Sequence, residues 1–464
     1  MGQKMLLTAN ERPKTGKWIA LCFQHLFAMF SATVLVPILT GLSISVALFC
    51  SGVGTLIYIL CTKHKVPIYL GSSFAYISYI SSAISLEGGG LGAALTGLLV
   101  VGIIYCLIAL IIYFVGTKWI DRLLPPVVVG PTIIVIGLGL ASTACGNAGF
   151  IPVEGSLQDW RLMVVSVITM VTAAIIAIKA KGFLKIIPFL IAIVVGYIAA
   201  IIFNLIPFGD CASIIEFDPL LEVLKNPSQW FKFPEFSFLG WTDVELPLGM
   251  KMVKINFAAT ISVIPLAFVT ICEHIGDHKV LGQITGEDYI KDPGLNRTLL
   301  GDGLATGVAA ILGGPANTSY GENTSVVGIS KVASVWVTGG AAVLAILLSF
   351  CNIFTTFIYT IPTAVMGGVC LILYGFIASN GLKTLIDAKV DMTNTRNLII
   401  VSVMLVIGLG GAAIHYGDVN FSGMALAAVI GILLNVFLPG KEKPSDSEEK
   451  IETIKEESSE NSLK

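Results

Sequence analysis

The sequence predicts an all-α polytopic membrane protein that crosses the lipid bilayer fourteen times, and three observations support this. The 464-residue chain is only 12% charged, about half the charged fraction of an ordinary soluble protein, which is roughly 25%. Its apolar residues, 55% of the total, form continuous runs of the length that spans the hydrocarbon layer as a helix. These runs do not alternate with polar residues as the strands of a membrane β-barrel do.

The apolar segments fall into two sets of seven. The first seven-span repeat, 18–207, contains segments near 18–42, 43–61, 67–84, 91–116, 126–143, 161–180 and 184–207. A polar connection, 208–252, separates it from the second repeat, 253–440, with segments near 253–276, 298–313, 316–331, 333–352, 361–380, 396–413 and 420–439. The charged tail, 441–464, lacks an apolar period and is expected to be disordered.

The basic residues predict the orientation of the chain in the membrane. With the N-terminal segment 1–17 in the cytoplasm, 18 Lys and Arg residues lie on the cytoplasmic side, the tail excluded, and five on the opposite side. This bias follows the positive-inside rule. We therefore expect a multi-pass protein of the cytoplasmic membrane, with both termini in the cytoplasm and an extracellular or periplasmic connection. The net charge of −2 gives no reason to expect a nucleic acid as a partner.

An odd number of spans in each half predicts an inverted repeat. The third and tenth segments, PIYLGSSFAYIS and PANTSYGENTSV, hold matching positions and share a Ser–aromatic–small sequence at 73–75 and 319–321. Irregular backbone at membrane depth survives only inside protein or against a cavity, so each segment is expected to be broken by a short extended stretch and to mark a transport site. Close helix packing through small residues is an alternative for the glycines, although it does not account for Glu322.

Three acidic residues lie at or near membrane depth: Glu273, Asp277 and Glu322. A charge there costs about 3 kcal/mol or more, so each is a functional candidate. Glu273 and Asp277, toward the end of the eighth segment, are four residues apart and therefore share one helical face. Two carboxylates one turn apart repel each other, which favours proton binding by one of them, as a proton-coupled carrier requires. The alternative for Asp277 is an interfacial residue that faces cytoplasmic water.

The histidines leave more than one interpretation open. His25 and His274 could serve either function or hydrogen-bonded packing, and His278 is expected at the membrane interface. These residues do not have metal-ligand spacing, and the sequence contains no hydrolase, nucleotide-binding or zinc motif. We therefore predict neither an enzyme nor a metal site nor a cofactor.

Several segments carry a family resemblance: QHLFAMFSATVLVP (24–37), YLGSSFAYIS (69–78), ICEHIGDH (271–278), DPGLNR (292–297) and NTSYGEN (317–323). In this order they resemble the bacterial uracil permeases of the nucleobase–cation symporter, or nucleobase–ascorbate transporter, family. The resemblance implies a core domain, spans 1–4 and 8–11, that moves against a gate domain, spans 5–7 and 12–14, to import uracil with a proton. It also suggests a homodimer through the gate domain. A xanthine or other purine carrier on the same fold is the alternative.

The resemblance also implies the roles of individual residues. It assigns uracil binding to the side chains of Glu273 and Glu322 and to the backbone amides of Phe74 and Gly321. It assigns the pocket wall to Ser73, Tyr320, Tyr374 and His25, and proton coupling to Asp277, Asn323 and Glu273. Uracil offers two N–H donors and two carbonyl acceptors, which carboxylates and amides at broken-helix ends can satisfy. Purine carriers often have Gln at the position of Glu322, so Glu322 favours uracil.

Overall fold

The computed structural model describes residues 5–152, 158–181, 184, 187–206, 213–416 and 419–440; the tail 441–464, expected to be disordered, lies outside them. Within these ranges, seven helical segments are long and apolar enough to cross a membrane. They are α1 (Thr15–Thr40), α2 (Ile44–Cys61), α4 (Leu91–Val115), α6 (Pro126–Gly139) continued by α7 (Ala141–Asn147), α8 (Trp160–Lys179), α11 (Thr260–Thr285) and α16 (Thr363–Asp387). Four shorter apolar helices are α9 (Pro188–Asn204), α14 (Val335–Ser349), α17 (Thr395–Leu409) and α18 (Gly423–Phe437).

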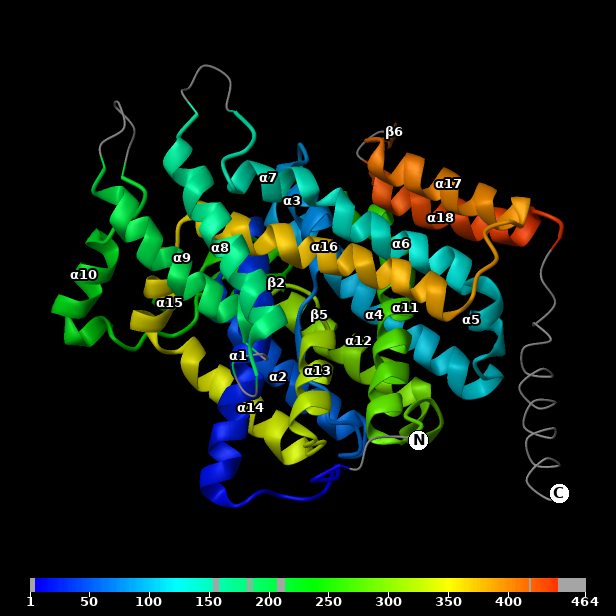
Figure 1. The fold of residues 1–464 in the computed structure, drawn as a ribbon, viewed down its shortest axis with the longest axis horizontal. Coiled ribbons are helices and arrows are strands. Elements are labelled where there is room, and N and C mark those ends of the chain that lie inside the picture. The colour runs from blue at the N-terminus through cyan, green and yellow to red at the C-terminus, as the bar shows by residue number, and fades with distance from the viewer. Residues whose placement is uncertain are drawn as a thin grey trace.

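The third and tenth apolar segments are broken, as the sequence predicts. In the third, strand β1 (Leu70–Ser72) leads through the 3-10 turn η1 (Phe74–Tyr76) into helix α3 (Ile77–Ser85). In the tenth, β5 (Asn317–Ser319) leads into α13 (Gly321–Ser330), after α12 (Leu295–Leu312). The two strands pair antiparallel in the middle of the molecule (Figure 1).

The connections contain more regular structure than the sequence suggests. In the connection 208–252, α10 (Asp218–Lys225) precedes β2 (Ser237–Gly240), β3 (Val244–Glu245) and β4 (Lys251–Lys254). Strand β4 pairs parallel with β2 and antiparallel with β3. Two short helices, α5 (Lys118–Leu123) and α15 (Asn352–Tyr359), and a hairpin of β6 (Ala413–Tyr416) and β7 (Val419–Ser422) join longer helices.

The eighth segment lies further along the chain than predicted. Residues 251–254 form β4, so the helix begins at Thr260 instead of 253 and continues to Thr285. It ends where Gly286 adopts a left-handed conformation with φ of 84°, which glycine reaches without steric cost. Glu273 and Asp277 therefore lie in the middle of α11, and the prediction that they lie toward its end was wrong.

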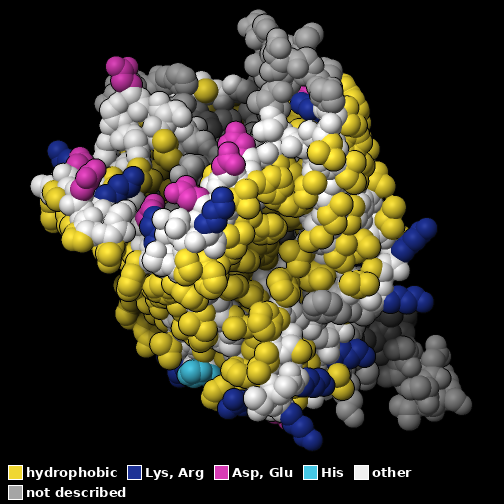
Figure 2. Space-filling model, turned by 90° about the vertical axis from the view of Figure 1, so that its left-hand side faces the viewer, with side chains coloured by type: hydrophobic (Ala, Val, Ile, Leu, Met, Phe, Trp, Pro, Cys, Tyr) yellow, Lys and Arg dark blue, Asp and Glu magenta, His cyan; other side chains and the backbone are white. Residues whose placement is uncertain are grey.

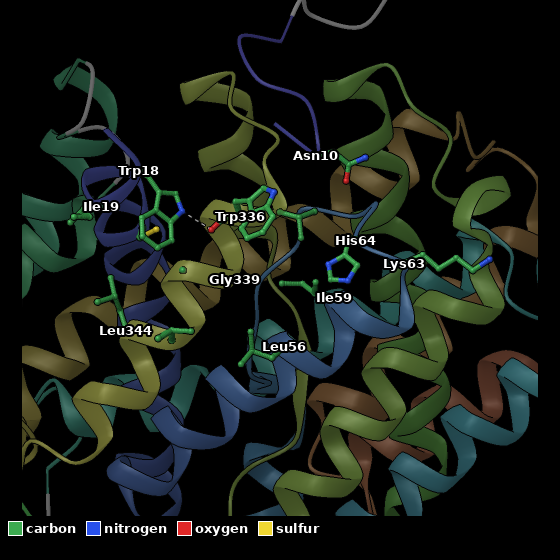
Figure 3. A pocket seen from close by; sticks show the side chains of 14 residues that line it. Asn10, Trp18, Ile19, Leu56, Ile59, Lys63, His64, Trp336, Gly339 and Leu344 are labelled. Carbon is green, nitrogen blue, oxygen red and sulfur yellow. Dashed lines mark hydrogen bonds between the residues drawn. The ribbon is translucent and has the colours of Figure 1, made fainter. Parts of the chain in front are cut away.

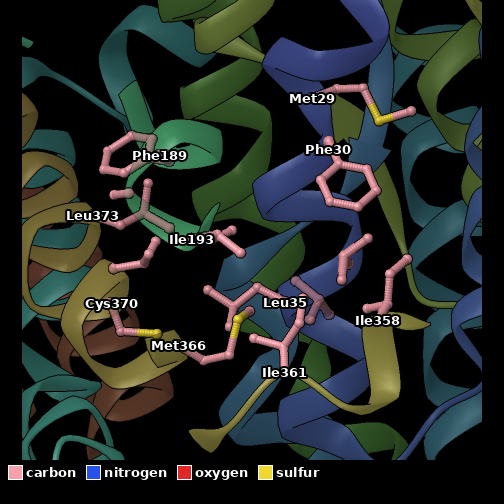
Figure 4. Close-up of a cluster of buried hydrophobic side chains, with 14 of the residues drawn as sticks. Met29, Phe30, Leu35, Phe189, Ile193, Ile358, Ile361, Met366, Cys370 and Leu373 are labelled. Atoms are coloured by element: carbon pink, nitrogen blue, oxygen red, sulfur yellow. The ribbon is translucent and has the colours of Figure 1, made fainter. Parts of the chain in front are cut away.

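The helices pack in two groups. In the first packing group, α12 packs on α2 and α4, α14 on α1 and α2, and α11 on α4 and α13. In the second packing group, α16 packs on α6, α7, α8 and α9, while α17 and α18 pack on each other and on α6. A buried apolar cluster joins α1 of the first group to α9 and α16 of the second (Figure 4). Its members include Met29, Phe30 and Leu35 of α1, Phe189 and Ile193 of α9, and Met366, Cys370 and Leu373 of α16.

Candidate functional site

The two broken segments cross so that each strand leads to the start of a half-helix. Leu70 pairs with Ser319, and backbone bonds extend the crossing at both ends. The Ser73 N–H donates to the carbonyl of Ala316 at 2.9 Å, and the Tyr320 N–H donates to that of Tyr69 at 3.1 Å. The next residues, Phe74 and Gly321, begin η1 and α13. The first N–H groups of a helix lack intrahelical acceptors and carry partial positive charge, so the crossing ends in two groups of hydrogen-bond donors.

Neighbouring helices provide hydrogen-bond partners for the backbone of the two strands. Backbone N–H and C=O groups at membrane depth need such partners. The hydroxyl of Ser51 in α2 donates to the Leu70 carbonyl at 2.8 Å. From α12, the hydroxyl of Thr306 donates to the Asn317 carbonyl at 2.7 Å. The Asn317 side-chain amide in turn donates to the carbonyl of Cys50 at 2.8 Å. These bonds fix the position of both strands between α2 and α12.

Two predicted wall residues, Ser73 and Tyr320, belong to the crossing itself, and both are buried. The Tyr320 hydroxyl donates to the Ser72 carbonyl at 2.7 Å and lies 3.3 Å from Oγ1 of Thr33 in α1. A Cβ at Gly71 would lie only 2.4 Å from the Tyr320 ring. The absence of a side chain at Gly71 therefore allows the ring to lie against β1.

Helix α11 brings an acidic residue, Asp277, to the end of the crossing. Glu273 and Asp277 are half-buried and one turn apart. A Cβ at Gly321 would lie 3.4 Å from Oδ1 of Asp277, so this carboxylate lies against the first residue of α13. That position does not support the alternative in which Asp277 faces cytoplasmic water. Glu322 is the second residue of α13, and its side chain lies outside the part of the chain that the structure describes.

The remaining predicted site residues form two pairs. The rings of Phe74 and Tyr374 meet edge to face with centroids 6.1 Å apart. This contact joins η1, which packs on α11 of the first packing group, to α16 of the second. In α13, the side-chain amide of Asn323 donates to Nδ1 and to the carbonyl oxygen of His25, both at 3.1 Å. Asn323 and His25 are both buried, so their contact holds α13 against α1.

The structure reveals one site-adjacent acid, Asp302, that sequence reasoning missed. Nδ1–H of His274 donates to Oδ2 of Asp302 at 2.7 Å, and the Ser319 hydroxyl donates to the same oxygen at 3.2 Å. Nε2 of His274 is hydrogen-bonded to the Thr298 hydroxyl at 3.0 Å. Asp302, His274 and Thr298 are at most 1% exposed. The signal was present in the sequence, since Asp302 interrupts an apolar segment and an acid at membrane depth is a functional candidate.

His278 is buried between helices, and its position at the membrane interface stays a prediction. Its Nδ1–H donates to the His274 carbonyl at 2.6 Å, which leaves Nε2 to accept from the Tyr58 hydroxyl at 2.5 Å. These partners remove the need for water around the imidazole ring. The two histidines fix α11 against α2 and α12, and they leave Glu273 and Asp277 on the adjoining, half-buried face.

The fold and its broken segments define a membrane transporter, and comparison with known proteins gives its family. The chain belongs to the permease family, which it matches over residues 16–417. It is an integral membrane transporter and not an enzyme.

Among its relatives are proteins named uracil permease. The chain is 45% identical over 447 residues to that of Bacillus caldolyticus, covering 96% of this chain and 97% of the relative. It is also 45% identical over 452 residues to that of Bacillus subtilis, covering 96% and 98% of the two chains. For the uracil permease of Escherichia coli K12, the identity is 39% over 427 residues, with 92% of each chain covered.

Solved structures share the fold at low sequence identity. The transmembrane domain of the cyanobacterial bicarbonate transporter BicA matches with a TM-score of 0.59 at 15% identity, covering 93% of this chain and all of that domain. The murine anion transporter Slc26a9 in its inward-facing state matches with a TM-score of 0.64 at 10% identity, covering 92% of this chain and 68% of that chain.

Proposed function

We propose that this protein imports uracil together with a proton across the cytoplasmic membrane by alternating access. The observation that carries the proposal is the crossing of β1 and β5. It ends in two helix N-termini, and the carboxylate of Asp277 in α11 lies against the first residue of one of them. Interrupted helices in matching positions of two halves are typical of the binding sites of secondary transporters. The relatives named uracil permease support uracil as the substrate.

The chemistry of uracil fits donors and acceptors from both sides of the crossing. The carboxylates of Glu273 and Glu322 accept hydrogen bonds from the ring N–H groups, and the amides of Phe74 and Gly321 donate to the ring carbonyls. The Phe74 ring, held edge to face by Tyr374, forms an apolar wall for the flat base. In this proposal Ser73 and Tyr320 keep the two amides in place and do not discriminate between bases.

Asp277 is the group that we propose to take up the coupled proton. Its carboxylate lies against Gly321 and one turn from Glu273, so its charge acts on the carboxylates that we propose to bind uracil. Like charges at this separation oppose each other, and a proton on Asp277 removes that repulsion when uracil binds. Asn323, bonded to His25 on the other side of α13, keeps this half-helix in register while the charge changes.

Alternating access would move the first packing group, as the core domain, against the second, as the gate domain. The contacts between them include the Phe74–Tyr374 ring pair and the apolar cluster of α1, α9 and α16. Apolar contacts can exchange partners without leaving buried polar groups unpaired. Both termini lie in the cytoplasm, and two copies of the chain form a homodimer through the gate domain.

Binding of labelled uracil to the purified protein tests the substrate and the site together. Unlabelled uracil should displace the label, and xanthine at the same concentration should not. Glu273→Gln should weaken binding at least tenfold, because a hydrogen bond to a charged group contributes about 1.5–3 kcal/mol. Glu245→Gln, which changes an exposed glutamate of the connection, is the matched control. Displacement by xanthine would favour a purine carrier, and normal binding by Glu273→Gln would remove this residue from the site.

A further inference from the structure

A hollow of about 810 Å³ lies on the outside of the first packing group, between α1, α2 and α14 (Figure 3). Its walls are mostly apolar and include Ile19 of α1, Leu56 and Ile59 of α2, and Val343 and Leu344 of α14. Ile19 and Val343 are 45% and 46% exposed. Two of its helices, α1 and α2, are long and apolar enough to cross a membrane, so we expect the hollow to open toward lipid. It shares no residue with the candidate transport site.

Two adjacent glycines of α14, Gly339 and Gly340, line the hollow. A Cβ at Gly340 would lie 2.4 Å from Sγ of Cys22 and 2.8 Å from the Trp18 ring, so Gly340 lets α1 approach α14 closely. A Cβ at Gly339 would meet its nearest neighbour, Cδ1 of Ile59, at 3.4 Å. That is an ordinary contact distance. A larger side chain at Gly339 would therefore extend into the hollow.

Polar and cationic side chains gather at one end of the hollow. Lys63 and His64 line it; His64 lies beside Ile59 and Lys63 extends outward from the same turn (Figure 3). The Arg12 guanidinium lies over the rings of Trp18 and Trp336, at 4.9 and 5.7 Å from their centroids. Trp, Lys and Arg side chains of this kind are typical of the boundary between membrane and water.

The turn that carries these two side chains has an unusual backbone. Lys63 and His64 have φ of 56° and 57°, a left-handed conformation that residues other than glycine rarely adopt. Backbone strain of this kind gathers at ligand sites, where the surrounding structure holds it in place. Here it places the His64 imidazole at the end of the apolar hollow, while the Lys63 side chain extends outward from the same turn (Figure 3).

We propose that the hollow binds one anionic glycerophospholipid. An acyl chain lies between α1, α2 and α14, and the phosphate lies next to Lys63, His64 and Arg12. The volume falls within the range of about 300–1,000 Å³ that is usual for sites binding small molecules. Hydrophobic side chains cover much of the face shown in Figure 2, and basic side chains and a histidine border them. The cationic groups select a negatively charged head group through charge complementarity.

Native mass spectrometry of the purified protein tests the site with phosphatidylglycerol and phosphatidylcholine of identical acyl chains. The wild type should retain one phosphatidylglycerol per chain and prefer it at least fivefold over phosphatidylcholine. The double variant Lys63→Gln/His64→Gln should lose this preference. Lys389→Gln is the matched control, because Lys389 is also exposed and has φ of 50° but does not line the hollow. It should keep the wild-type preference.

Filling the hollow tests the acyl-chain part of the site. Gly339→Leu should reduce retention of both lipids severalfold; if this variant does not fold, Val343→Trp fills the same space from an exposed position. Equal retention of the two lipids by the wild type, or an unchanged preference in the double variant, would overturn the proposal. Full retention of phosphatidylglycerol by a folded filling variant would also overturn it.

Discussion

Replacing Gly71 by alanine perturbs the crossing of the two broken segments at its tightest point. An added Cβ would lie 2.4 and 2.5 Å from two ring carbons of Tyr320 and 2.7 Å from Oγ1 of Thr33. Carbon atoms in contact normally lie about 3.5–4.0 Å apart, so the ring must move by about 1 Å or more. That displacement would break the 2.7 Å hydrogen bond from the Tyr320 hydroxyl to the Ser72 carbonyl.

The expected loss of folding stability has two contributions. Overpacking a well-packed interior costs about 1–3 kcal/mol, and the lost hydrogen bond adds about 1 kcal/mol. Tyr320 directly precedes Gly321, so moving its ring also moves the amide that we propose to bind uracil. We expect Gly71→Ala to raise the Kd for uracil at least tenfold, or by about 1.4 kcal/mol, and to lower the melting temperature in detergent.

Two comparisons separate this effect from a general response to alanine. Gly146 is an exposed helical glycine with no atom within 4 Å of an added Cβ, so Gly146→Ala should stabilise its helix by up to about 1 kcal/mol and leave binding unchanged. In a Tyr320→Ala background, Gly71→Ala should have a smaller effect, because the clashing ring is gone. A melting temperature and a uracil affinity equal to those of the wild type in Gly71→Ala would refute the close contact between Gly71 and the Tyr320 ring.

Three further substitutions test other parts of the structure. Tyr58→Phe leaves Nε2 of His278 without its donor and should lower stability by about 1–3 kcal/mol, measured by thermal melting. Burial works to raise the pKa of Asp159, but hydrogen bonds from Arg161 outweigh it and hold the pKa below its usual value. The charged pair therefore stabilises the fold above about pH 4 and loses this contribution as the pH falls through the lowered pKa. Asp159→Asn should lower the melting temperature at pH 7, and its difference from the wild type should shrink at acidic pH. Asp277→Asn should keep uracil binding within about tenfold but flatten the pH dependence of uptake.

For each of these substitutions, one outcome would contradict the predicted effect. Tyr113→Phe changes an exposed tyrosine and should not alter melting; if Tyr58→Phe behaves like it, the His278 hydrogen bond contributes no stability. A melting difference for Asp159→Asn that is independent of pH would contradict the role of the charged pair. A wild-type pH profile in Asp277→Asn would exclude coupling through this carboxylate, and complete loss of binding would make it a ligand.

The sequence predicted the fold where long apolar runs carry the information. Helices such as α2 and α4 begin and end within a residue or two of the predicted segments, because length and hydropathy alone define a membrane span. Residues 277–285 of α11 were missed because polar residues, among them His274 and His278, lie around the end of the predicted segment. Their hydrogen-bond partners come from other helices, and such long-range pairing cannot be read from local composition.

Part of the candidate site was also predictable from the sequence. The matching Ser–aromatic–small sequences identified the two extended segments that cross, and the spacing of Glu273 and Asp277 identified one face of α11. Asp302 could have been singled out as an acid within an apolar run. Its bond to His274, 28 residues away, depends on the way α11 packs against α12, which the sequence pattern does not determine.

Uracil accumulation in proteoliposomes that contain only this protein tests the central claim most directly. With the outside made acidic and labelled uracil added there, the internal concentration should rise above the external one. The accumulated label should leave again when a protonophore collapses the pH gradient. Uptake that stops at equal concentrations inside and outside, and that a protonophore does not alter, would contradict proton-coupled import.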